Sequence, residues 1–218
     1  MEITSYINID FQVISPDESI KNVQAIFNST TFTHLPIIHN NVLVGNISED
    51  DCKSFDNSEN IEAYNYLYNA FHVKKSTSWL DVLEAFVLNE TNIMPVLDED
   101  DLYIGIYELN DILSFFNETP FLSEPGSTIV VEKNRRDYSF SEIAQIIESN
   151  NGKILGIFIS DLKDNITQVT LKITSGGLNE ILQTFRRYNY EVILGSEEDT
   201  YLKELKERSE YLNKYLNI

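Results

Sequence analysis

Apolar residues recur with helical periodicity in two segments of the first half of the chain. In both segments they recur at spacings of three and four, which predicts amphipathic helices. The apolar positions are Ile20, Val23, Ile26 and Phe27 in the first segment and Trp79, Val82, Leu83, Phe86 and Val87 in the second. Ser19 and Ser78 precede these segments, where a side-chain oxygen can accept from a free helix N–H. We therefore expect both serines to be N-caps.

The sequence pattern around these helices occurs twice along the chain. At an offset of 59 residues Pro36 aligns with Pro95, and at an offset of 60 Gly45 aligns with Gly105. Each copy predicts a short extended segment, a helix, a hairpin and a second helix, which together make a βαββα unit. The predicted segments are 11–15, 20–27, 35–44 and 49–55 in the first copy, and 71–75, 79–87, 93–105 and 109–116 in the second. Neither unit is large enough to bury its apolar faces alone, so we expect the two to pack together as a pseudo-twofold pair.

The second half of the chain has a different pattern. An apolar run at 128–131 precedes Ser139 and Glu142, whose spacing is typical of a capping box at a helix start. Apolar and polar residues alternate over 169–173, which is typical of a strand with one exposed face. With further predicted elements at 154–160, 178–185 and 191–194, the order is βαββαβ, a ferredoxin-like plait.

Charge and composition change between the two halves. The 218 residues hold 35 acids and 16 bases, for a net charge of −19, and residues 1–122 hold 20 of the acids but only 4 of the bases. Pro120, Pro125 and Gly126 mark a linker. The predicted domains are 1–60 and 61–122 for the two repeats, 123–126 for the linker, 127–195 for the plait and 196–218 for a C-terminal amphipathic helix.

Several functional classes conflict with this composition. Nucleic acids and anionic membranes are bound through clustered Lys and Arg, so we expect neither as a partner. The single cysteine, Cys52, excludes an internal disulfide and favours a reducing compartment. No apolar stretch approaches the roughly 18 residues of a membrane span, and the first residues lack a leader pattern. The three histidines lack metal-ligand spacing. We expect a soluble cytoplasmic protein without a metal site.

The repeated motifs resemble a known family. The first copy reads Leu35-Pro36-Ile37-Ile38 and later Gly45-Asn46-Ile47-Ser48-Glu49-Asp50-Asp51, and the second reads Met94-Pro95-Val96-Leu97 and later Gly105-Ile106-Tyr107-Glu108-Leu109-Asn110-Asp111. Over residues 3–118 this pattern resembles a tandem pair of CBS domains. The predicted fold class is therefore α/β (α+β), with two βαββα CBS units and the C-terminal plait.

The residues at the end of the motif have chemistry that suits a ligand. A glycine at position 45 lets another group come close to the strand, Ser48 lies at a helix start, and Asp51 follows one turn later on the same side. The resemblance implies that the serine and aspartate bind the phosphate and ribose of an adenosine-type ligand, while adenine lies between aliphatic segments. The expected contacts are Pro36, Ile37, Gly45, Ile47, Ser48 and Asp51, with Gly105 and Asp111 from the second copy. Glu108 replaces the hydroxyl residue in the second copy, and its carboxylate would repel phosphate.

Two alternatives stay open for this motif. Ser48 and Asp51 could form only a helix N-cap and a first-turn acid, leaving an empty, purely structural pair. If a ligand binds, the net charge of −16 over residues 1–122 requires Mg²⁺ or another divalent cation beside a nucleotide, or a cationic ligand such as S-adenosylmethionine. We expect no tightly bound cofactor.

The plait resembles an ACT domain, and the whole arrangement is similar to bacterial acetoin-utilisation CBS/ACT proteins. The resemblance implies amino-acid binding at a dimer interface, but the turn Asp137-Tyr138-Ser139-Phe140 lacks the family's Pro-Gly. A plait that only pairs with its twin is the alternative. We therefore predict a non-enzymatic regulatory homodimer that acts on an unidentified downstream protein, or else a constitutive homodimeric scaffold without a small ligand.

Overall fold

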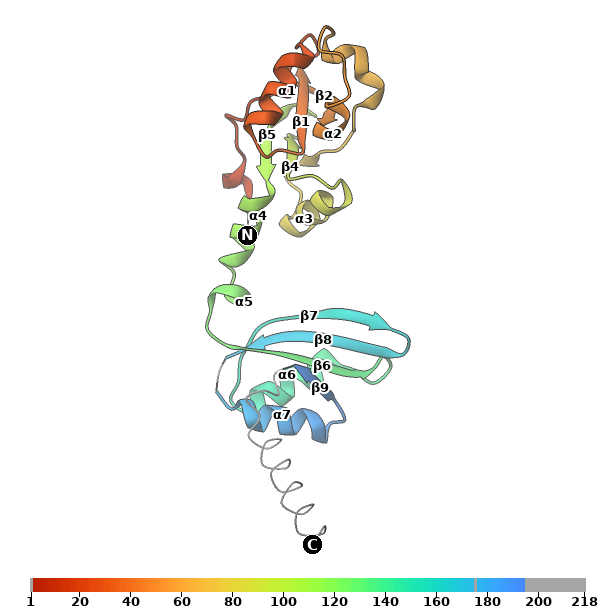
Figure 1. Ribbon diagram of the computed structural model, residues 1–218. Coiled ribbons are helices and arrows are strands. Elements are labelled where there is room, and N and C mark those ends of the chain that lie inside the picture. Colours follow the sequence, from red (N-terminus) through yellow and green to blue (C-terminus); the bar gives the residue numbers. More distant parts are fainter. Residues whose placement is uncertain (1, 175, 195–218) are drawn as a thin grey trace. The chain divides into compact units, whose positions relative to one another are not determined.

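The computed structural model describes residues 2–174 and 176–194, and the chain divides after Phe116 into two compact units (Figure 1). In chain order the elements of the first unit are η1 (Thr4–Tyr6), α1 (Ile20–Ser29), β1 (His34–His39), β2 (Val42–Ser48), α2 (Glu49–Cys52), η2 (Ile61–Leu67), β3 (Val73–Lys74), α3 (Trp79–Leu88), β4 (Ile93–Leu97), β5 (Tyr103–Glu108) and α4 (Leu109–Asn117). The mixed α+β fold class and the paired βαββα units are confirmed.

Each repeat builds its sheet in the same way. In the first, β1 pairs antiparallel with β2, and Ile14 forms a parallel bridge to Ile37. In the second, β4 pairs antiparallel with β5, and β3 pairs parallel with β4. The β1–β2 turn places Asn40 and Asn41 at φ 52° and 64°, which the right-handed twist of a two-residue hairpin loop requires.

The predicted N-caps are confirmed, and one predicted helix is too long. Ser19 Oγ accepts from the Asn22 N–H at 3.3 Å, and Ser78 Oγ accepts from the Asp81 N–H at 3.3 Å. The helix predicted over 49–55 ends at Cys52. Beyond it the chain tightens into turns in which the Ser54 N–H donates to the Asp51 carbonyl, a spacing of three rather than four residues.

Thr33 and Asn92, which are equivalent positions at the offset of 59, bind each other across the two repeats. The Thr33 N–H donates to Asn92 Oδ1 at 2.9 Å, and the Asn92 N–H donates to Thr33 Oγ1 at 3.1 Å. The Thr33 hydroxyl lies 3.1 Å from Asn92 Oδ1, and Asn92 Nδ2 donates to the Thr31 carbonyl at 2.7 Å. We call this reciprocal pairing of Thr33 and Asn92 the seam.

A second contact between equivalent positions lies at the hairpin tips. Val42 and Leu102, at the offset of 60, form an antiparallel bridge, and the Tyr103 N–H donates to the Asn41 carbonyl at 2.8 Å. When a residue meets its own equivalent, the two partners are related by a twofold axis. The two repeats therefore pack as a pseudo-twofold pair, as predicted.

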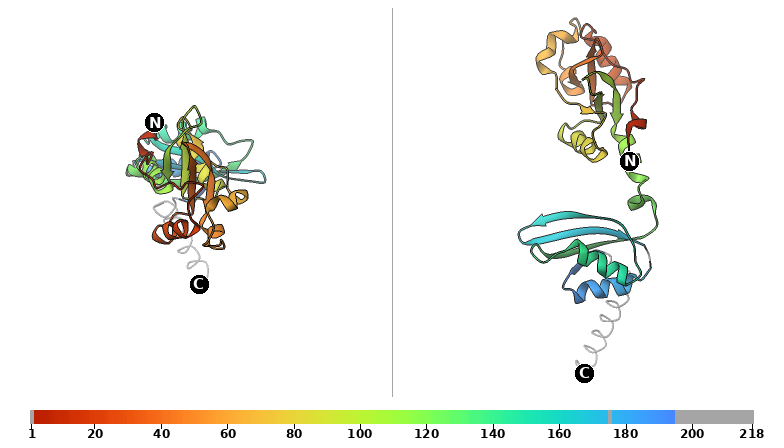
Figure 2. Two further views of the ribbon diagram at one scale, coloured as in Figure 1. Left: turned by 90° about the horizontal axis from the view of Figure 1, so that it is seen from above. Right: turned by 180° about the vertical axis from the view of Figure 1, so that it is seen from behind.

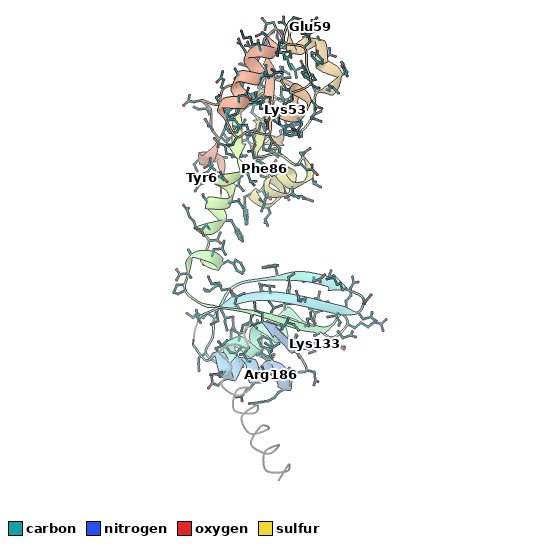
Figure 3. All side chains as sticks on the ribbon, viewed as in Figure 1. Tyr6, Lys53, Glu59, Phe86, Lys133 and Arg186 are labelled. Carbon is teal, nitrogen blue, oxygen red and sulfur yellow. The ribbon has the colours of Figure 1, made fainter. Side chains whose placement is uncertain are left out.

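Each repeat has its own core beside these contacts. The first core is formed by Ile14, Ile20, Val23, Phe27, Leu35, Ile37, Ile47, Cys52, Phe55 and Ile61. The second is formed by Ile3, Phe71, Val73, Val82, Phe86, Met94, Val96, Tyr107, Ile112 and Phe115. Of these, Phe86 of α3 is labelled in Figure 3. Ile3 belongs to the first predicted repeat but packs in the second core, whereas Ile61 belongs to the second predicted repeat but packs in the first core. The chain therefore ties the repeats together through both cores.

The second unit is a four-stranded sheet with two helices on one face (Figure 2). Its elements are α5 (Pro120–Ser123), β6 (Ser127–Asn134), α6 (Phe140–Ser149), β7 (Ile154–Lys163), β8 (Ile166–Ile173), α7 (Leu178–Arg187) and β9 (Glu191–Leu194). The strand order β7-β8-β6-β9 and the element order βαββαβ confirm the ferredoxin-like plait. The predicted helix at 196–218 lies outside the described residues.

The segment before the plait packs on it. Phe121 of α5 meets the Phe158 ring at 5.8 Å in a T-shaped arrangement, and a Cβ at Gly156 would lie 2.2 Å from Phe121 Cδ2. Residues 120–123 are thus part of the second unit's packing, ahead of the linker predicted at 123–126. Among the helices in the described part of the chain, none has the length and hydrophobicity needed to cross a bilayer.

We expect the seam to contribute measurably to stability. Asn92→Ala leaves the Thr33 N–H without its acceptor, so the free energy of unfolding should fall by about 1–3 kcal/mol in urea titrations. Thr33→Ala and the double variant complete a cycle, and the double variant should lose less than the sum of the single losses. The control is Asn22→Ala, an exposed helix position, with a loss below about 0.5 kcal/mol. Additive single losses would show that the two side chains do not interact.

Candidate ligand site

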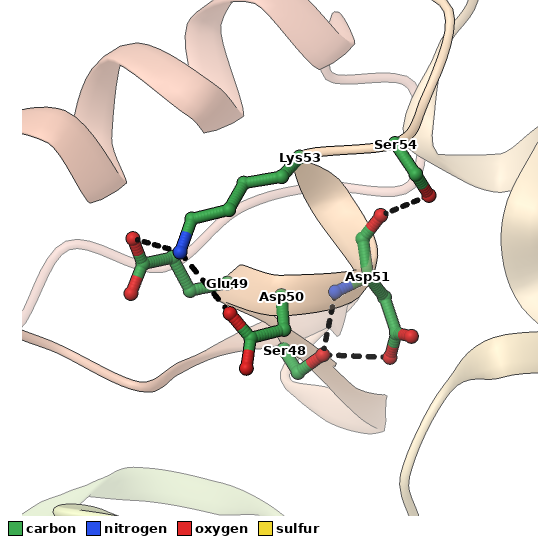
Figure 4. A network of polar contacts seen from close by, with 6 residues as sticks. All are labelled: Ser48, Glu49, Asp50, Asp51, Lys53 and Ser54. Atoms are coloured by element: carbon green, nitrogen blue, oxygen red, sulfur yellow. Dashed lines mark hydrogen bonds and ion pairs between the residues drawn. The ribbon is translucent and has the colours of Figure 1, made fainter.

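Ser48 and Asp51 lie where β2 passes into α2, and they are hydrogen-bonded to each other (Figure 4). Ser48 is the N-cap of α2, and its Oγ accepts from the Asp51 N–H at 3.1 Å. The same hydroxyl donates to Asp51 Oδ2 at 2.6 Å. The structure thus brings the two predicted ligand groups together, and each satisfies the other.

Two backbone donors at the start of α2 are already used. The Glu49 N–H donates to the Thr33 carbonyl at 2.9 Å, and the Asp51 N–H is taken by Ser48. An anion at a helix start depends on such N–H groups. A phosphate that binds through these two N–H groups must therefore displace part of the present network.

The first turn of α2 carries three consecutive carboxylates, Glu49, Asp50 and Asp51. Lys53 Nζ lies 3.0 Å from Glu49 Oε1 and 3.1 Å from Asp50 Oδ1, and these hydrogen bonds raise the pKa of the Lys53 ammonium. Because the Lys53 side chain is 60% exposed, solvent screens its charge. The site is therefore net negative, and within the described residues no group of three or more His, Cys, Asp or Glu side chains could hold a metal ion.

Two aromatic side chains stand beside this site. His34 is the ladder partner of Ser48 in β1, and its ring meets Phe71 at 5.2 Å in a T-shaped arrangement. Phe71 is held there by Asn46 of β2, which is fully buried and whose Nδ2 donates to the Asn69 and Phe71 carbonyls at 3.0 and 2.9 Å. Residues 69–71, which lead into the second repeat, are thus bound to the candidate site of the first repeat.

His34 is a neighbour of the candidate site that the sequence pattern did not predict. Burial lowers the pKa of its imidazole, and the carboxylates of Asp51 and Asp50 oppose that shift. The histidine precedes Ser48 by 14 residues, and only the β1–β2 register brings them together. Sequence spacing therefore carried no signal for it.

The other predicted contacts of the first copy are buried. Ile37 and Ile47 are fully buried in the first core, and Pro36 is a buried residue of β1 whose carbonyl accepts from the Ile14 N–H. At Gly45 a Cβ would lie 2.8 Å from Tyr68 Cβ, so the group that comes close to this glycine is the protein's own chain. Their predicted role as ligand contacts stays a prediction.

The second copy has the same plan with different polar groups. Gly105 has φ +150°, and a Cβ there would lie 2.7 Å from the Asn8 carbonyl oxygen. Glu108, which stands where the first copy has Ser48, accepts from Asn8 Nδ2 at 3.2 Å. Asp111 is partly exposed in the first turn of α4. This copy presents two carboxylates and no hydroxyl at the place of the serine.

Two surface hollows lie near these elements. A hollow of 230 Å³ is lined by Gln24, Phe27, Asn28, Glu49, Cys52 and Lys53, between α1 and α2. Burial raises the pKa of the Cys52 thiol to about 11, which keeps it protonated at neutral pH. A larger hollow of 700 Å³ is lined by Glu2, Ile3, Thr4, Lys75, Ser76, Thr77, Ser78, Trp79 and Glu99. Glu49 and Lys53 connect the smaller hollow to the candidate site.

In the second unit, the turn between β6 and α6 is held by the protein's own side chains. Lys133 Nζ lies 2.6 Å from Glu142 Oε2 and 4.2 Å from the centre of the Tyr190 ring. The Ser139 Oγ accepts from the Glu142 N–H at 3.4 Å, whereas the Glu142 carboxylate binds Lys133. The capping-box prediction is thus correct for the serine and wrong for the glutamate. Asp137 is exposed beside this turn.

Comparison with known proteins identifies the first unit. Residues 3–57 and 67–118 each match the CBS domain family, so this part of the chain is a tandem pair of CBS domains. A comparison with curated protein sequences finds no match. The ACT-like nature of the plait and the similarity to acetoin-utilisation proteins stay predictions.

Several solved structures are similar to the chain. A CBS domain pair/ACT domain protein from Thermotoga maritima is 16% identical, with a TM-score of 0.49, over 54% of this chain and 98% of that one. The CBS domains of a transcriptional regulator from Streptococcus pneumoniae are 15% identical, with a TM-score of 0.46, over 52% and 98%. CBSX2 in complex with AMP is 20% identical, with a TM-score of 0.44, over 53% and 95%.

The half-buried His34 predicts a pH dependence of stability. Its pKa in the folded state lies below 6.5, so the unfolded chain binds the proton more readily. The stability that comes from keeping His34 neutral is fully present above pH 6.5. It is lost as the pH falls from 6.5 through the lowered pKa of the folded state. We expect His34→Gln to flatten the decline of the free energy of unfolding between pH 7 and 5. His39→Gln, at an exposed turn position, should keep the original slope. The same slope in all three proteins would contradict the assignment.

Proposed function

Because residues 3–118 form a tandem pair of CBS domains, we propose that this protein is a non-catalytic regulatory sensor that binds an adenosine-type ligand at Ser48 and Asp51. One observation carries the proposal. The Thr33 carbonyl accepts the first N–H of α2, while the rest of Thr33 binds Asn92 of the other repeat. A ligand that moves the start of α2 would therefore act directly on the seam.

The two polar residues have complementary roles in this proposal. The Ser48 hydroxyl would donate to a phosphate oxygen or another acceptor of the ligand, and the Asp51 carboxylate would accept from the two ribose hydroxyls. In the structure these groups bind each other at 2.6 Å. Ligand binding would then exchange one internal hydrogen bond for several external ones, which limits the desolvation cost.

The charge of the site selects among adenosine ligands. Glu49, Asp50 and Asp51 face a single exposed ammonium, that of Lys53. Bare ATP would be repelled at short range, because like charges within a few ångströms raise the free energy of the complex. We therefore expect binding of a nucleotide together with Mg²⁺, or of a ligand with a positive group such as S-adenosylmethionine.

The response to ligand would be a shift between two packings of the repeats. The Asn92 carbonyl accepts the Leu109 N–H at 3.0 Å at the start of α4, just as the Thr33 carbonyl accepts from Glu49 at the start of α2. The seam thus touches the helix that carries Asp51 and the helix that carries Asp111. A ligand that prefers one arrangement of α2 changes the population of arrangements at α4.

In this proposal the second unit transmits or stabilises the response. We assign it as an ACT-like plait that forms a homodimer, in the manner of the acetoin-utilisation proteins it resembles. Its turn at Asp137 is flanked in sequence by Lys133 and Glu142, which form an ion pair, and it lacks the Pro-Gly of amino-acid-binding members. Dimerisation, rather than amino-acid binding, is therefore its assigned role. A downstream protein would bind differently to the ligand-bound and the unbound protein.

A constitutive homodimeric scaffold is the second candidate. It is favoured by the mutual hydrogen bonds of Ser48 and Asp51, which leave the helix start satisfied without a ligand. In that case the CBS pair would serve only as a rigid body.

Thermal unfolding with added ligand separates the two candidates. A ligand that binds only the folded protein raises its melting temperature as the ligand concentration rises. At a concentration of 100 times Kd, the free energy of unfolding increases by about 2.7 kcal/mol. We expect a rise with S-adenosylmethionine, or with AMP, ADP or ATP in the presence of Mg²⁺. No rise with any of these at millimolar concentration would leave the scaffold as the function.

Two matched variants identify the site. Asp51→Asn removes the ribose acceptor and should weaken binding at least tenfold. Asp50→Asn makes the same change in charge at the neighbouring exposed residue and should preserve binding, or strengthen it for ATP without Mg²⁺. Equal weakening by both variants would show that net charge, rather than Asp51, determines binding.

A further inference from the structure

Asn46 is a buried polar residue on the same strand as the candidate ligand group Ser48. The two residues lie on β2 with Ile47 between them, and the pairing of β2 with β1 is regular from Gly45 to Ser48. Successive side chains of a strand point to opposite faces, so Asn46 and Ser48 share one face, while Ile47 points into the first core. The fully buried amide of Asn46 therefore lies on the side of β2 that carries the candidate site.

The orientation of the Asn46 amide is fixed by its donor half. Nδ2 donates to the Asn69 carbonyl at 3.0 Å and to the Phe71 carbonyl at 2.9 Å. Because the nitrogen has two hydrogens to donate and an amide oxygen has none, the nitrogen must face the two carbonyls. The acceptor half, Oδ1, is buried and has no hydrogen-bond partner among the described residues.

The second repeat shows that the fold does not require a polar residue at this place. Ile106 is equivalent to Asn46 at the offset of 60, and it is also fully buried. Its backbone forms an antiparallel bridge to Asn8, as the backbone of Asn46 does to Asn69. A buried acceptor without a partner lowers stability. A ligand group that donates to Oδ1 would offset that cost.

The position of Asn46 selects the part of the ligand that it can meet. Ser48 and Asp51, to which the proposed function assigns the phosphate and the ribose, lie at the start of α2. Asn46 lies two residues back along β2, roughly 6–7 Å from Ser48, in buried surroundings that suit the base. An acceptor there requires a donor on the base. The exocyclic amine of adenine is such a donor, whereas a 6-oxo purine has a carbonyl oxygen in its place.

We propose that Asn46 Oδ1 accepts a hydrogen bond from the exocyclic amine of the ligand's base and makes the site specific for a 6-amino purine. The inference rests on the proposed function and adds the residue that distinguishes the base. A 6-oxo purine would place its carbonyl oxygen against Oδ1, and two acceptors would then meet without a proton between them.

Access to Oδ1 requires a small rearrangement, because the atom is buried in the structure. Asn46 binds the Phe71 carbonyl, and the Phe71 ring packs against that of His34, the ladder partner of Ser48. We expect the Phe71 ring to turn aside when the base enters.

Calorimetric titration of the full chain with matched purines tests the inference. The pairs are ATP and ITP, each with Mg²⁺, and S-adenosylmethionine and S-inosylmethionine, because the proposed function admits either kind of ligand. Within the pair that binds, we expect the 6-amino compound to bind at least tenfold more tightly. Equal affinities within that pair would overturn the inference and leave the proposed function intact. No binding by either pair would refute the proposed function, and the inference with it.

Two variants test whether Asn46 is the source of this preference. Asn46→Leu removes the acceptor with a side chain of similar shape, and Asn46→Ile installs the residue of the second repeat. We expect each variant to lower the preference for the 6-amino compound to about threefold or less. Circular dichroism confirms that the variants are folded.

Phe71→Leu is the matched control. It disturbs the segment that Asn46 holds but keeps Oδ1, so the preference should stay at tenfold or more, whatever the change in affinity. If Asn46 only fastens residues 69–71 to β2, Asn46→Leu will weaken both compounds of a pair alike and preserve the preference. That result would overturn the inference.

Discussion

The reciprocal pairing of Thr33 with Asn92 is the constraint on which the first unit depends. The side chain of each residue satisfies the backbone N–H of the other, and each carbonyl accepts the first N–H of a helix, α2 in one repeat and α4 in the other. One pair of equivalent residues thus joins the repeats and fixes both helix starts. The candidate ligand groups Ser48 and Asp51 lie on one of these helix starts, so their geometry cannot change without affecting the seam.

The pseudo-twofold scaffold carries unlike surfaces on its two halves. The first repeat has a hydroxyl, Ser48, at the start of its second helix, where the second repeat has Glu108. The second repeat exposes Leu80, Val87 and Leu88 on α3, where the first has Lys21, Asn28 and Ser29. The two repeats have the same fold although these side chains differ. The fold therefore does not require these particular side chains, and we attribute them to function. In our account the first repeat receives the ligand.

Features set by local interactions could be predicted from the sequence. Ser19 and Ser78 cap helices because a hydroxyl next to a helix start meets the N–H three residues on, and the alternation over 169–173 marks β8 of the plait. The seam and His34 could not be predicted, because they depend on which distant backbone lies opposite. The end of α2 at Cys52 was also missed, since its tight turns depend on hydrogen bonds that no apolar pattern encodes.

Native-state hydrogen exchange measures the cooperativity of the first unit most directly. If the seam joins the repeats, the core amides of β1 and of β4 exchange through one opening with the same free energy. Asn92→Ala would lower that free energy at both strands. Separate openings, with Asn92→Ala affecting β4 alone, would contradict the account, because the two repeats would then be independent and a ligand at Ser48 could not be felt at α4.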